Sequence, residues 1–376
     1  MRILYVALKF DYNRAEQGPS FEHYNFFDTL QNLGHEILYF DFGTLYLRLG
    51  RERMNQRLVE VAHSEKPDLM FTVLMADELD PAAIRSISGG HPCPTLNWFC
   101  DDHYRFESFT RRWAPAFDYV VTTANSALAK YQAMGYRNVI KSQWACNHFL
   151  YRKVNLPLKY DVTFVGQPHG NRRELVRALK MANIDVKTWG TGWDTGRLSQ
   201  DKMIKIFNSS RINLNFSNAA SPERSATLLR NNVAKFFRRT GLMPIAKKAR
   251  RLVSLNPFIT RQSVTRMGMV RYLEQIKGRN FEVPGCGGFL LTAPAENLDS
   301  YYVPGRELAS FDTVGELIDK VRYFLANEAE RVTIAEAGYQ RTIREHTYAH
   351  RFADIFKHMG FNSDNSAVSE QVELIT

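Results

Sequence analysis

The feature that most constrains the fold of this chain is an alternation of apolar runs with amphipathic segments. In the first part of the chain, runs such as "ILYVAL", "DLMFTVL" and "TLNWFC" are separated by segments with apolar residues at helical spacing. Continuous apolar runs of this length are typical of parallel strands that are buried on both faces. We therefore predict an α/β fold whose binding loops lie at the carboxyl ends of its strands.

The alternation occurs twice. The polar segment "YRKVNLPLKYD", which contains Pro157, interrupts it, and "VTFVG" restarts it. A length of 376 residues agrees with two domains of ordinary size. We predict two Rossmann-like, doubly wound domains that face each other across a cleft, at residues 1–150 and 158–345. A helix at about 345–360 is predicted to pack back on the first domain, and the polar tail 361–376 is predicted to be disordered.

Positive charge is the main compositional bias, with a net charge of +10. It is concentrated in a predicted helical insertion at about 221–268. Within it, residues 224–254 combine Lys and Arg with apolar residues at helical spacing, a composition typical of helices that lie on anionic membranes. A basic helical pair packed on its own domain is the alternative. No nucleic-acid-binding motif is present, so no nucleic acid partner is expected.

Other classes are disfavoured by what the sequence lacks. It has no run of about 18 apolar residues and no signal-peptide pattern, so we expect a cytoplasmic protein, with peripheral contact to the inner face of the membrane as a second expectation. The four cysteines show no metal-ligand spacing and are expected to be reduced thiols. The loops after the first strand of each half lack the G-x-G-x-x-G and Walker A patterns, which argues against nicotinamide enzymes and P-loop ATPases.

The loop "GQPHGNRR" still suits an anion. It leads into a predicted helix whose first N–H groups are free to bind phosphate, and its arginines can add charge-assisted hydrogen bonds. An ordinary turn with exposed arginines is the alternative. The candidate donor-binding residues of this loop are Gly166, His169, Arg172 and Arg173.

The stretch "QIKGRNFEVPGCGGFLLT" raises the question of why Glu282 stands in an apolar run just before a glycine-rich turn. A carboxylate accepts hydrogen bonds from vicinal hydroxyls, so Glu282 suits a ribose or sugar diol. Lys277 and Arg279 suit a diphosphate. Glu274 precedes Glu282 in a Glu-x7-Glu spacing, so the two carboxylates can address different parts of one ligand.

A second candidate site follows the apolar run "TLNWFC". Asp101, Asp102 and His103 stand at the predicted carboxyl end of this strand. Adjacent carboxylates and an imidazole can move protons or stabilise a developing oxocarbenium charge, so we consider these three residues as catalytic candidates. Helix capping by one of the aspartates is the simpler alternative.

The stretch "KGRNFEVPGCGGFLLT" resembles the donor-site signature of GT-B glycosyltransferases, in the spore-maturation-protein-like subgroup related to the family-4 enzymes. The subgroup pattern is roughly R-x-F-E-x-x-A-C-G, and the chain matches it at Arg279, Phe281, Glu282, Cys286 and Gly287, with Gly285 in place of the alanine.

This resemblance implies roles for the two glutamates. Glu282 would bind the nucleotide ribose, and Glu274 would lie by the donor sugar as a catalytic residue. The Gly-Phe-Gly that usually follows the first glutamate is replaced by Gln275, Ile276 and Lys277. Lys277 or Arg279 is therefore expected to take over part of that contact.

The N-terminal segment "GPSFEHYNFFDTLQNLGHEI" is similar to the GT-B opening, in which a glycine loop after the first strand faces the acceptor. By this resemblance Gly18, Ser20, Glu22 and His23 are candidate acceptor-side residues. A helix N-terminus with a capping serine and a solvated glutamate is the alternative reading of the same residues.

The function implied by the resemblance is sugar transfer from a nucleotide-diphosphate sugar to a hydroxyl of a glycan, lipid-linked saccharide or small molecule. The enzyme would be of hexosyltransferase type, retaining and metal-independent, would need no cofactor besides the nucleotide-sugar co-substrate, and would serve polysaccharide biosynthesis for the cell envelope. The alternatives are a nucleotide-sugar epimerase of the same fold and a non-catalytic sugar- or nucleotide-binding surface-assembly protein.

Overall fold

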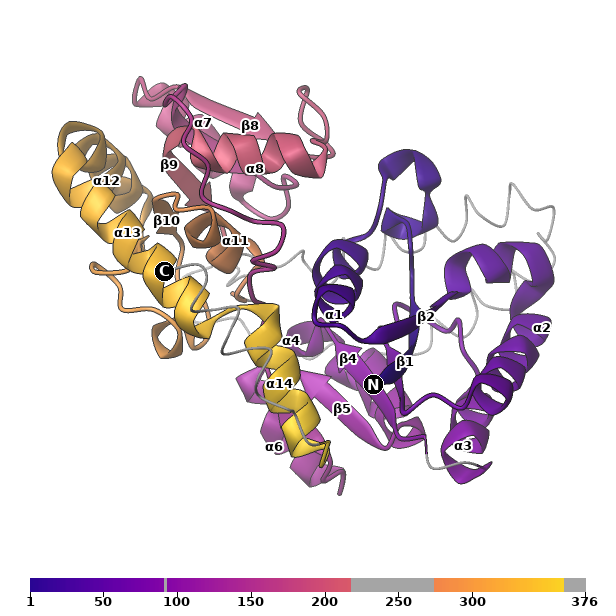
Figure 1. The fold of residues 1–376 in the computed structure, drawn as a ribbon. Coiled ribbons are helices and arrows are strands. Elements are labelled where there is room, and N and C mark those ends of the chain that lie inside the picture. Colours follow the sequence, from indigo (N-terminus) through magenta and orange to yellow (C-terminus); the bar gives the residue numbers. More distant parts are fainter. Residues whose placement is uncertain (91–92, 218–273, 362–376) are drawn as a thin grey trace.

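The chain forms two parallel β-sheets, each with helices packed against it (Figure 1). The structure is a computed structural model that describes residues 1–90, 93–217 and 274–361. The predicted insertion, including its candidate membrane-contact segment 224–254, lies outside the described residues, as does the tail after Phe361.

The first sheet has six strands in the order β2-β1-β3-β4-β5-β6, all parallel. Alternate residues of its strands enter two separate cores, since Leu4 and Val6 pack on one face and Ile3 and Tyr5 on the other. Helices cover both faces, and this explains why the strand sequences are continuously apolar. The strands are β1 (Arg2–Ala7), β2 (Glu36–Asp41), β3 (Leu69–Thr72), β4 (Thr95–Phe99), β5 (Tyr119–Thr122) and β6 (Val139–Lys141).

The connections of the first domain are helical. The longest helix begins after Asp41, whose side chain accepts a hydrogen bond from the Thr44 amide, and it is kinked at Gly50, where φ is +77°. A π-helical segment, His23–Phe27, runs directly into α1. The helices are α1 (Asp28–Asn32), α2 (Phe42–Glu65), α3 (Pro81–Gly90), α4 (Asp102–Arg105), α5 (Arg111–Trp113) and α6 (Leu128–Ala133).

The second sheet has five strands in the order β11-β10-β9-β7-β8, again all parallel. Two cores lie on its two faces, one around Phe164 and the other around Phe281. The strands are β7 (Tyr160–Val165), β8 (Val186–Trp189), β9 (Ser210–Asn215), β10 (Leu290–Thr292) and β11 (Ala309–Ser310). The helices are α7 (Arg172–Met181), α8 (Gln200–Asn208), α11 (Arg279–Gly285), α12 (Val314–Ala326) and α13 (Glu328–Glu345). The predicted α/β class with two doubly wound domains is confirmed.

Within the described residues, the chain crosses between the domains twice. After α13 it returns to the first domain, where α14 (Tyr348–His358) packs Tyr348, Phe352 and Ile355 into the core that contains Ile3 (Figure 1). Backbone hydrogen bonds join the two crossings. The Cys146 amide donates to the His346 carbonyl at 2.9 Å, and the Tyr348 amide donates to the Cys146 carbonyl at 3.0 Å. The linker between the domains is thereby held against the returning chain.

Buried histidines make stability depend on pH. Burial lowers the pKa of His103, His148 and His346 to about 4, below the usual 6.5. These side chains stay neutral in the folded chain but bind protons when the chain unfolds below pH 6.5. Their contribution to the free energy of unfolding is therefore complete above pH 6.5 and is lost as the pH falls towards 4. We expect the free energy of unfolding, measured with urea, to decrease from pH 7 to pH 5.

The matched variant is His148→Gln, which removes one of these groups. Buried carboxyl groups with raised pKa, such as Glu282, act in the opposite direction, so the comparison between variant and wild type is the informative one. The decrease between pH 7 and pH 5 should be smaller in His148→Gln. Equal decreases in the two proteins would contradict this role of His148.

Candidate functional site

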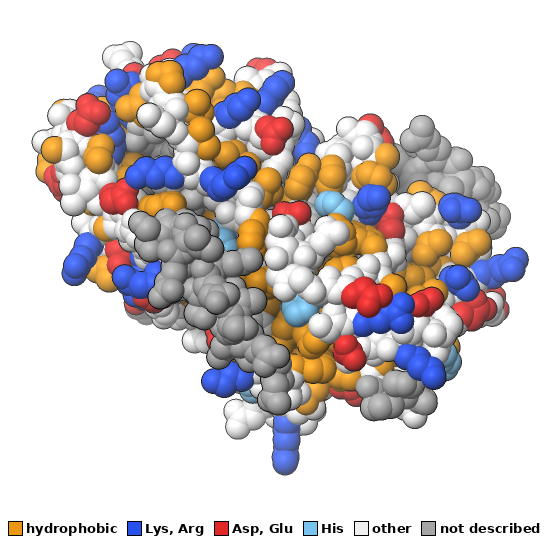
Figure 2. Space-filling view, viewed as in Figure 1, with side chains coloured by type: hydrophobic (Ala, Val, Ile, Leu, Met, Phe, Trp, Pro, Cys, Tyr) orange, Lys and Arg blue, Asp and Glu red, His pale blue; other side chains and the backbone are white. Residues whose placement is uncertain are grey.

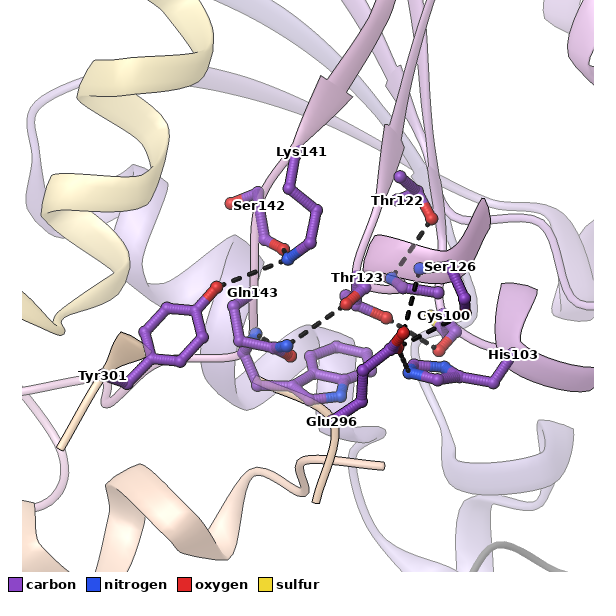
Figure 3. A network of polar contacts seen from close by, with 12 residues as sticks. Cys100, His103, Thr122, Thr123, Ser126, Lys141, Ser142, Gln143, Glu296 and Tyr301 are labelled. Carbon is purple, nitrogen blue, oxygen red and sulfur yellow. Dashed lines mark hydrogen bonds and ion pairs between the residues drawn. The ribbon is translucent and has the colours of Figure 1, made fainter. Parts of the chain in front are cut away.

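Loops that follow strands of the two sheets meet where the domains join. The surface between the two lobes is indented (Figure 2). Glu296, in the loop after β10, crosses to the first domain. Its carboxylate accepts a hydrogen bond from the Ser126 amide at 3.0 Å and lies 3.3 Å from Nε2 of His103, as Figure 3 shows. A second contact joins Lys141, at the end of β6, to the hydroxyl of Tyr301 at 3.3 Å. We call the region around these contacts the domain interface.

A group of cations lines the second-domain side of the interface. Burial and the charge of Arg172 lower the pKa of Lys277 to about 7, while Asp101 of the first domain opposes this shift. Burial and Arg279 lower the pKa of Arg172 to about 9. The third cation, Arg279, lies close to Gly166, since a Cβ built there would be in ordinary contact with its Nη2 at 3.5 Å. We call Lys277, Arg172 and Arg279 the cation cluster. Their like charges repel one another, so an anion bound among them would be stabilised.

Arg172 also has a structural role. Its guanidinium donates to the Gln167 carbonyl at 2.8 Å and to the Phe216 carbonyl at 2.7 Å, which fastens the loop after β7 to the end of β9. Arg173 instead donates to the Gly192 carbonyl and lies over the ring of Trp193, 4.9 Å from its centroid. Arg173 therefore packs on the loop after β8, which matches the exposed arginine of the simpler alternative.

His169 and Glu274 are the other second-domain candidates. His169 is partly buried in the loop between β7 and α7. Glu274 is exposed at the start of the last described segment, and the amide of the next residue donates to the Ser217 carbonyl at 3.1 Å. The expected role of Glu274 beside a donor sugar stays a prediction.

Glu282 lies on α11 and is 1% exposed. Its Oε1 accepts a hydrogen bond from the hydroxyl of Tyr151 at 3.0 Å, whereas its Oε2 is buried and has no hydrogen-bond partner within the described residues. Burial raises the pKa of this carboxyl, and Arg279 and Tyr151 oppose the shift. A Cβ at Gly278 would lie 2.9 Å from Oε1 and equally close to the ring of Phe21, so the first domain closes over this carboxylate. A buried oxygen without a partner is costly, and a hydroxyl donor would remove that cost.

The first-domain side of the interface carries carboxylates. Burial raises the pKa of Glu22, and the charge of Asp101 raises it further, so the two groups lie within electrostatic reach of each other. Asp101 also acts on the pKa of Lys277, so it lies within electrostatic reach of the cation cluster as well. His103 is neutral at pH 7, since burial lowers its pKa to about 4, and its Nδ1 is buried without a hydrogen-bond partner in the described part of the chain.

The remaining acceptor-side candidates shape the loop after β1. Ser20 is buried, donates to the Leu8 carbonyl at 2.7 Å and accepts from the His23 amide at 3.0 Å, so it caps the following helical segment. Gly18 has a φ of +77°, a conformation that favours glycine. The His23 ring stacks on Phe27 with a centroid distance of 4.7 Å, inside the first domain. For Ser20 and His23, the geometry supports the structural alternative.

The position of the Asp102 side chain does not fit the catalytic role considered for it. Its side chain is fully buried, its Oδ1 accepts from the Thr110 hydroxyl at 2.5 Å and its Oδ2 from the Tyr131 hydroxyl at 2.8 Å. Because neighbouring residues at a helix start point in different directions, Asp101 faces the interface while Asp102 points into the first domain. Of the three candidates after β4, Asp101 and His103 are brought to the interface and Asp102 is a structural residue.

No group of three or more His, Cys, Asp or Glu side chains that could hold a metal ion occurs within 1–90, 93–217 and 274–361. The polar groups at the interface are instead single carboxylates, one imidazole and the cation cluster. Such a set suits hydroxyl groups and an anion.

The fold matches known structures over almost its whole length. HepE of Anabaena, solved in complex with UDP-glucose, is 12% identical, with a TM-score of 0.61 and coverage of 96% of this chain and 99% of that one. A glycosyltransferase from Rickettsia africae is 9% identical, with a TM-score of 0.51 and coverage of 89% and 87%. Residues 171–238 and 245–357 match the family model described as glycosyl transferase-like. The chain therefore has the GT-B fold of these glycosyltransferases, and the matched residues are similar to the glycosyl transferase-like family.

A relative in sequence points the same way. The spore protein CgeB of Bacillus subtilis is 22% identical over 286 residues, which cover 75% of this chain and 80% of the relative. The resemblance to GT-B glycosyltransferases is therefore confirmed.

Three interface residues of this GT-B protein were missed in the sequence. Lys141 is the last residue of β6 and Glu296 lies in the loop after β10, so the rule that selected Asp101 could have found them if it had been applied to strand ends and the loops beyond them. Tyr151 carries no such signal, because it stands in a polar linker and meets Glu282 only in the folded chain.

The structural role of Asp102 can be tested by comparing Asp102→Ala with Asp101→Ala. Removing the Asp102 carboxylate leaves two buried hydroxyls without their acceptor, which should lower the free energy of unfolding by about 2–4 kcal/mol. Asp101 is partly buried at the interface, and its loss should cost less than about 1 kcal/mol. Urea unfolding followed by circular dichroism measures both, and equal losses would contradict the distinction.

Proposed function

We propose that this protein transfers a sugar from a nucleoside-diphosphate sugar to a hydroxyl group of a glycan, lipid-linked saccharide or small molecule. The glycosyl transferase-like match and the GT-B fold support the class of reaction. The observation that carries the proposal is the buried Oε2 of Glu282, which has no hydrogen-bond partner among the described residues, close to a cluster of three cations that would attract an anion. A ribose diol next to a diphosphate supplies both.

The donor would bind mainly to the second domain. Glu282 accepts hydrogen bonds from the ribose hydroxyls, and Lys277, Arg279 and Arg172 neutralise the diphosphate. When the bond between sugar and diphosphate breaks, negative charge grows on the departing phosphate, and cations already in place stabilise it without reorganisation. UDP is the first donor nucleotide to test, because HepE was solved with UDP-glucose.

The first-domain carboxylates face the transferred sugar and the acceptor. Glu22 and Asp101 can accept hydrogen bonds from the acceptor hydroxyl, and Nδ1 of His103, which has no partner among the described residues, can bind a sugar hydroxyl. We extend the proposal to a retaining hexosyltransferase, which is supported by the resemblance of the donor stretch to family-4 enzymes. Metal independence is supported by the cation cluster, because three cations can do the work that a metal does on a diphosphate.

The setting of the reaction is part of the proposal. We propose a cytoplasmic enzyme of cell-envelope polysaccharide biosynthesis that contacts the inner face of the membrane through 224–254. The positive charge of that segment supports membrane contact. In the described part of the chain, every helix is too short or too polar to span a bilayer.

A donor screen tests the reaction. The protein is incubated with UDP-, GDP- and ADP-sugars, with and without hydroxyl acceptors, and products are separated by chromatography. Released nucleoside diphosphate with a glycosylated acceptor supports the proposal. An isomerised donor would show an epimerase, and binding without turnover would show a non-catalytic binding protein.

The ribose contact predicts the behaviour of Glu282→Gln. Replacing the charged acceptor by an amide weakens hydrogen bonds from the diol, so the dissociation constant for UDP should rise by about tenfold or more, while the circular dichroism spectrum is unchanged. Calorimetry measures the binding. Glu78→Gln is the matched control, because Glu78 also has a pKa raised by burial but belongs to the first domain, where its carboxylate accepts from the Ala76 amide.

Lys277 predicts a pH dependence of donor binding. Its pKa of about 7 in the free protein should rise when a diphosphate binds beside it, so the complex holds more protons than the free protein above pH 7. Affinity for UDP should therefore fall as the pH rises from 7 to 9, and Lys277→Met should remove most of this slope. An unchanged slope in Lys277→Met would place the diphosphate elsewhere.

A further inference from the structure

Glu282 is held by a hydrogen-bonded chain that starts outside its own helix. The side-chain amide of Gln200, at the start of α8, donates to the hydroxyl of Tyr151, and this hydroxyl donates to Oε1 of Glu282 at 3.0 Å. Tyr151 is 1% exposed, as is Glu282. Water therefore does not compete for these groups, and each donor has a single direction in which to point.

Tyr151 stands where the chain changes domain. Four residues earlier, the side chain of Asn147 donates to the Tyr24 carbonyl at 2.6 Å and to Asp28 at 2.9 Å, both in the first domain. The Tyr151 amide donates back to the Asn147 carbonyl at 2.8 Å, which closes a turn. Just after Tyr151, the Arg152 carbonyl accepts from the side chain of Asn208 at the end of α8.

The turn from 147 to 151 therefore has one end fixed in the first domain and the other in the second. Within the described residues, the hydroxyl of Tyr151 donates to Oε1 of Glu282, and Oε2 has no hydrogen-bond partner. A carboxylate held by one oxygen keeps its plane and presents the other oxygen in one direction. A pair of vicinal hydroxyls could donate hydrogen bonds to an oxygen that is held in this way.

We propose that Tyr151 is a positioning residue for recognition of the donor's ribose diol, which it controls from the interdomain linker through Glu282. This inference rests on the proposed function. The inference adds to the proposed function that the interdomain linker takes part in setting the affinity for the donor. Tyr151 does not touch the donor itself, and its effect is confined to the hydroxyls that Glu282 accepts.

The test uses UDP and its 2′,3′-dideoxy analogue, which lacks the diol, as calorimetric probes of the full chain. Wild type should bind UDP about tenfold more tightly than the analogue. Tyr151→Phe, which removes only the hydroxyl, should lose most of this difference in affinity. Its affinity for UDP should fall, and its affinity for the analogue should stay at the wild-type value. In turnover with UDP-glucose, KM should rise with little change in kcat, because the ribose is remote from the reacting bond.

The matched control is Tyr302→Phe. Tyr302 is also 1% exposed, belongs to the same core, and its hydroxyl is 2.7 Å from that of Thr342. It should retain the wild-type difference between the two probes. Gln200→Leu is a second variant, because Gln200 is partly exposed and its loss leaves Tyr151 buried. In this variant the difference in affinity between the two probes should shrink by about threefold.

The outcomes separate this inference from the proposed function. If Tyr151→Phe and Gln200→Leu keep the wild-type difference, or if Tyr302→Phe loses it equally, the inference is overturned while the donor site stands. If wild type binds both probes equally well, Glu282 is not the ligand of the diol and the inference falls with that assignment. If wild type binds neither probe nor any other nucleoside diphosphate, the proposed function fails as well.

Discussion

The contact between the two chain crossings is the constraint on which the rest of this structure depends. Cys146 exchanges backbone hydrogen bonds with the His346–Tyr348 segment, so the linker and the returning chain form one buried unit. Buried backbone groups must be paired, and these pairs are available only in one relation of the two segments. Glu296 can then reach His103, and Tyr151 can reach Glu282, because the domains from which they come are held in this relation.

Electrostatics gives the interface its chemistry. The second domain contributes cations whose pKa values are lowered by burial and by one another, and the first domain contributes carboxylates, of which Glu22 has a raised pKa. Asp101 acts on groups of both sides. Shifted pKa values that gather where two domains meet are a pattern expected of a ligand site. A charged ligand between the two sets would relieve both.

Much of the fold could be predicted because buried parallel strands leave a direct record in sequence. Apolar runs such as "ILYVAL" and "DLMFTVL" became β1 and β3 with both faces covered. Glu282 and Lys277 were found because a charged residue in an apolar run is costly and so points to a partner. The same logic did not separate Asp101 from Asp102, since adjacent residues share every sequence signal and differ only in direction.

What the sequence determined by itself was local: strand and helix periodicity, the two-part α/β organisation, and the residues that stand at strand ends. These follow from the spacing of apolar side chains and from turn chemistry, which act over a few residues. Only the tertiary structure decided which of those residues share a site. Tyr151 and Glu282 are far apart in the chain, and Glu296 and His103 lie in different domains. Their meeting depends on long-range packing of the two sheets, α14 and the linker, which no short pattern encodes.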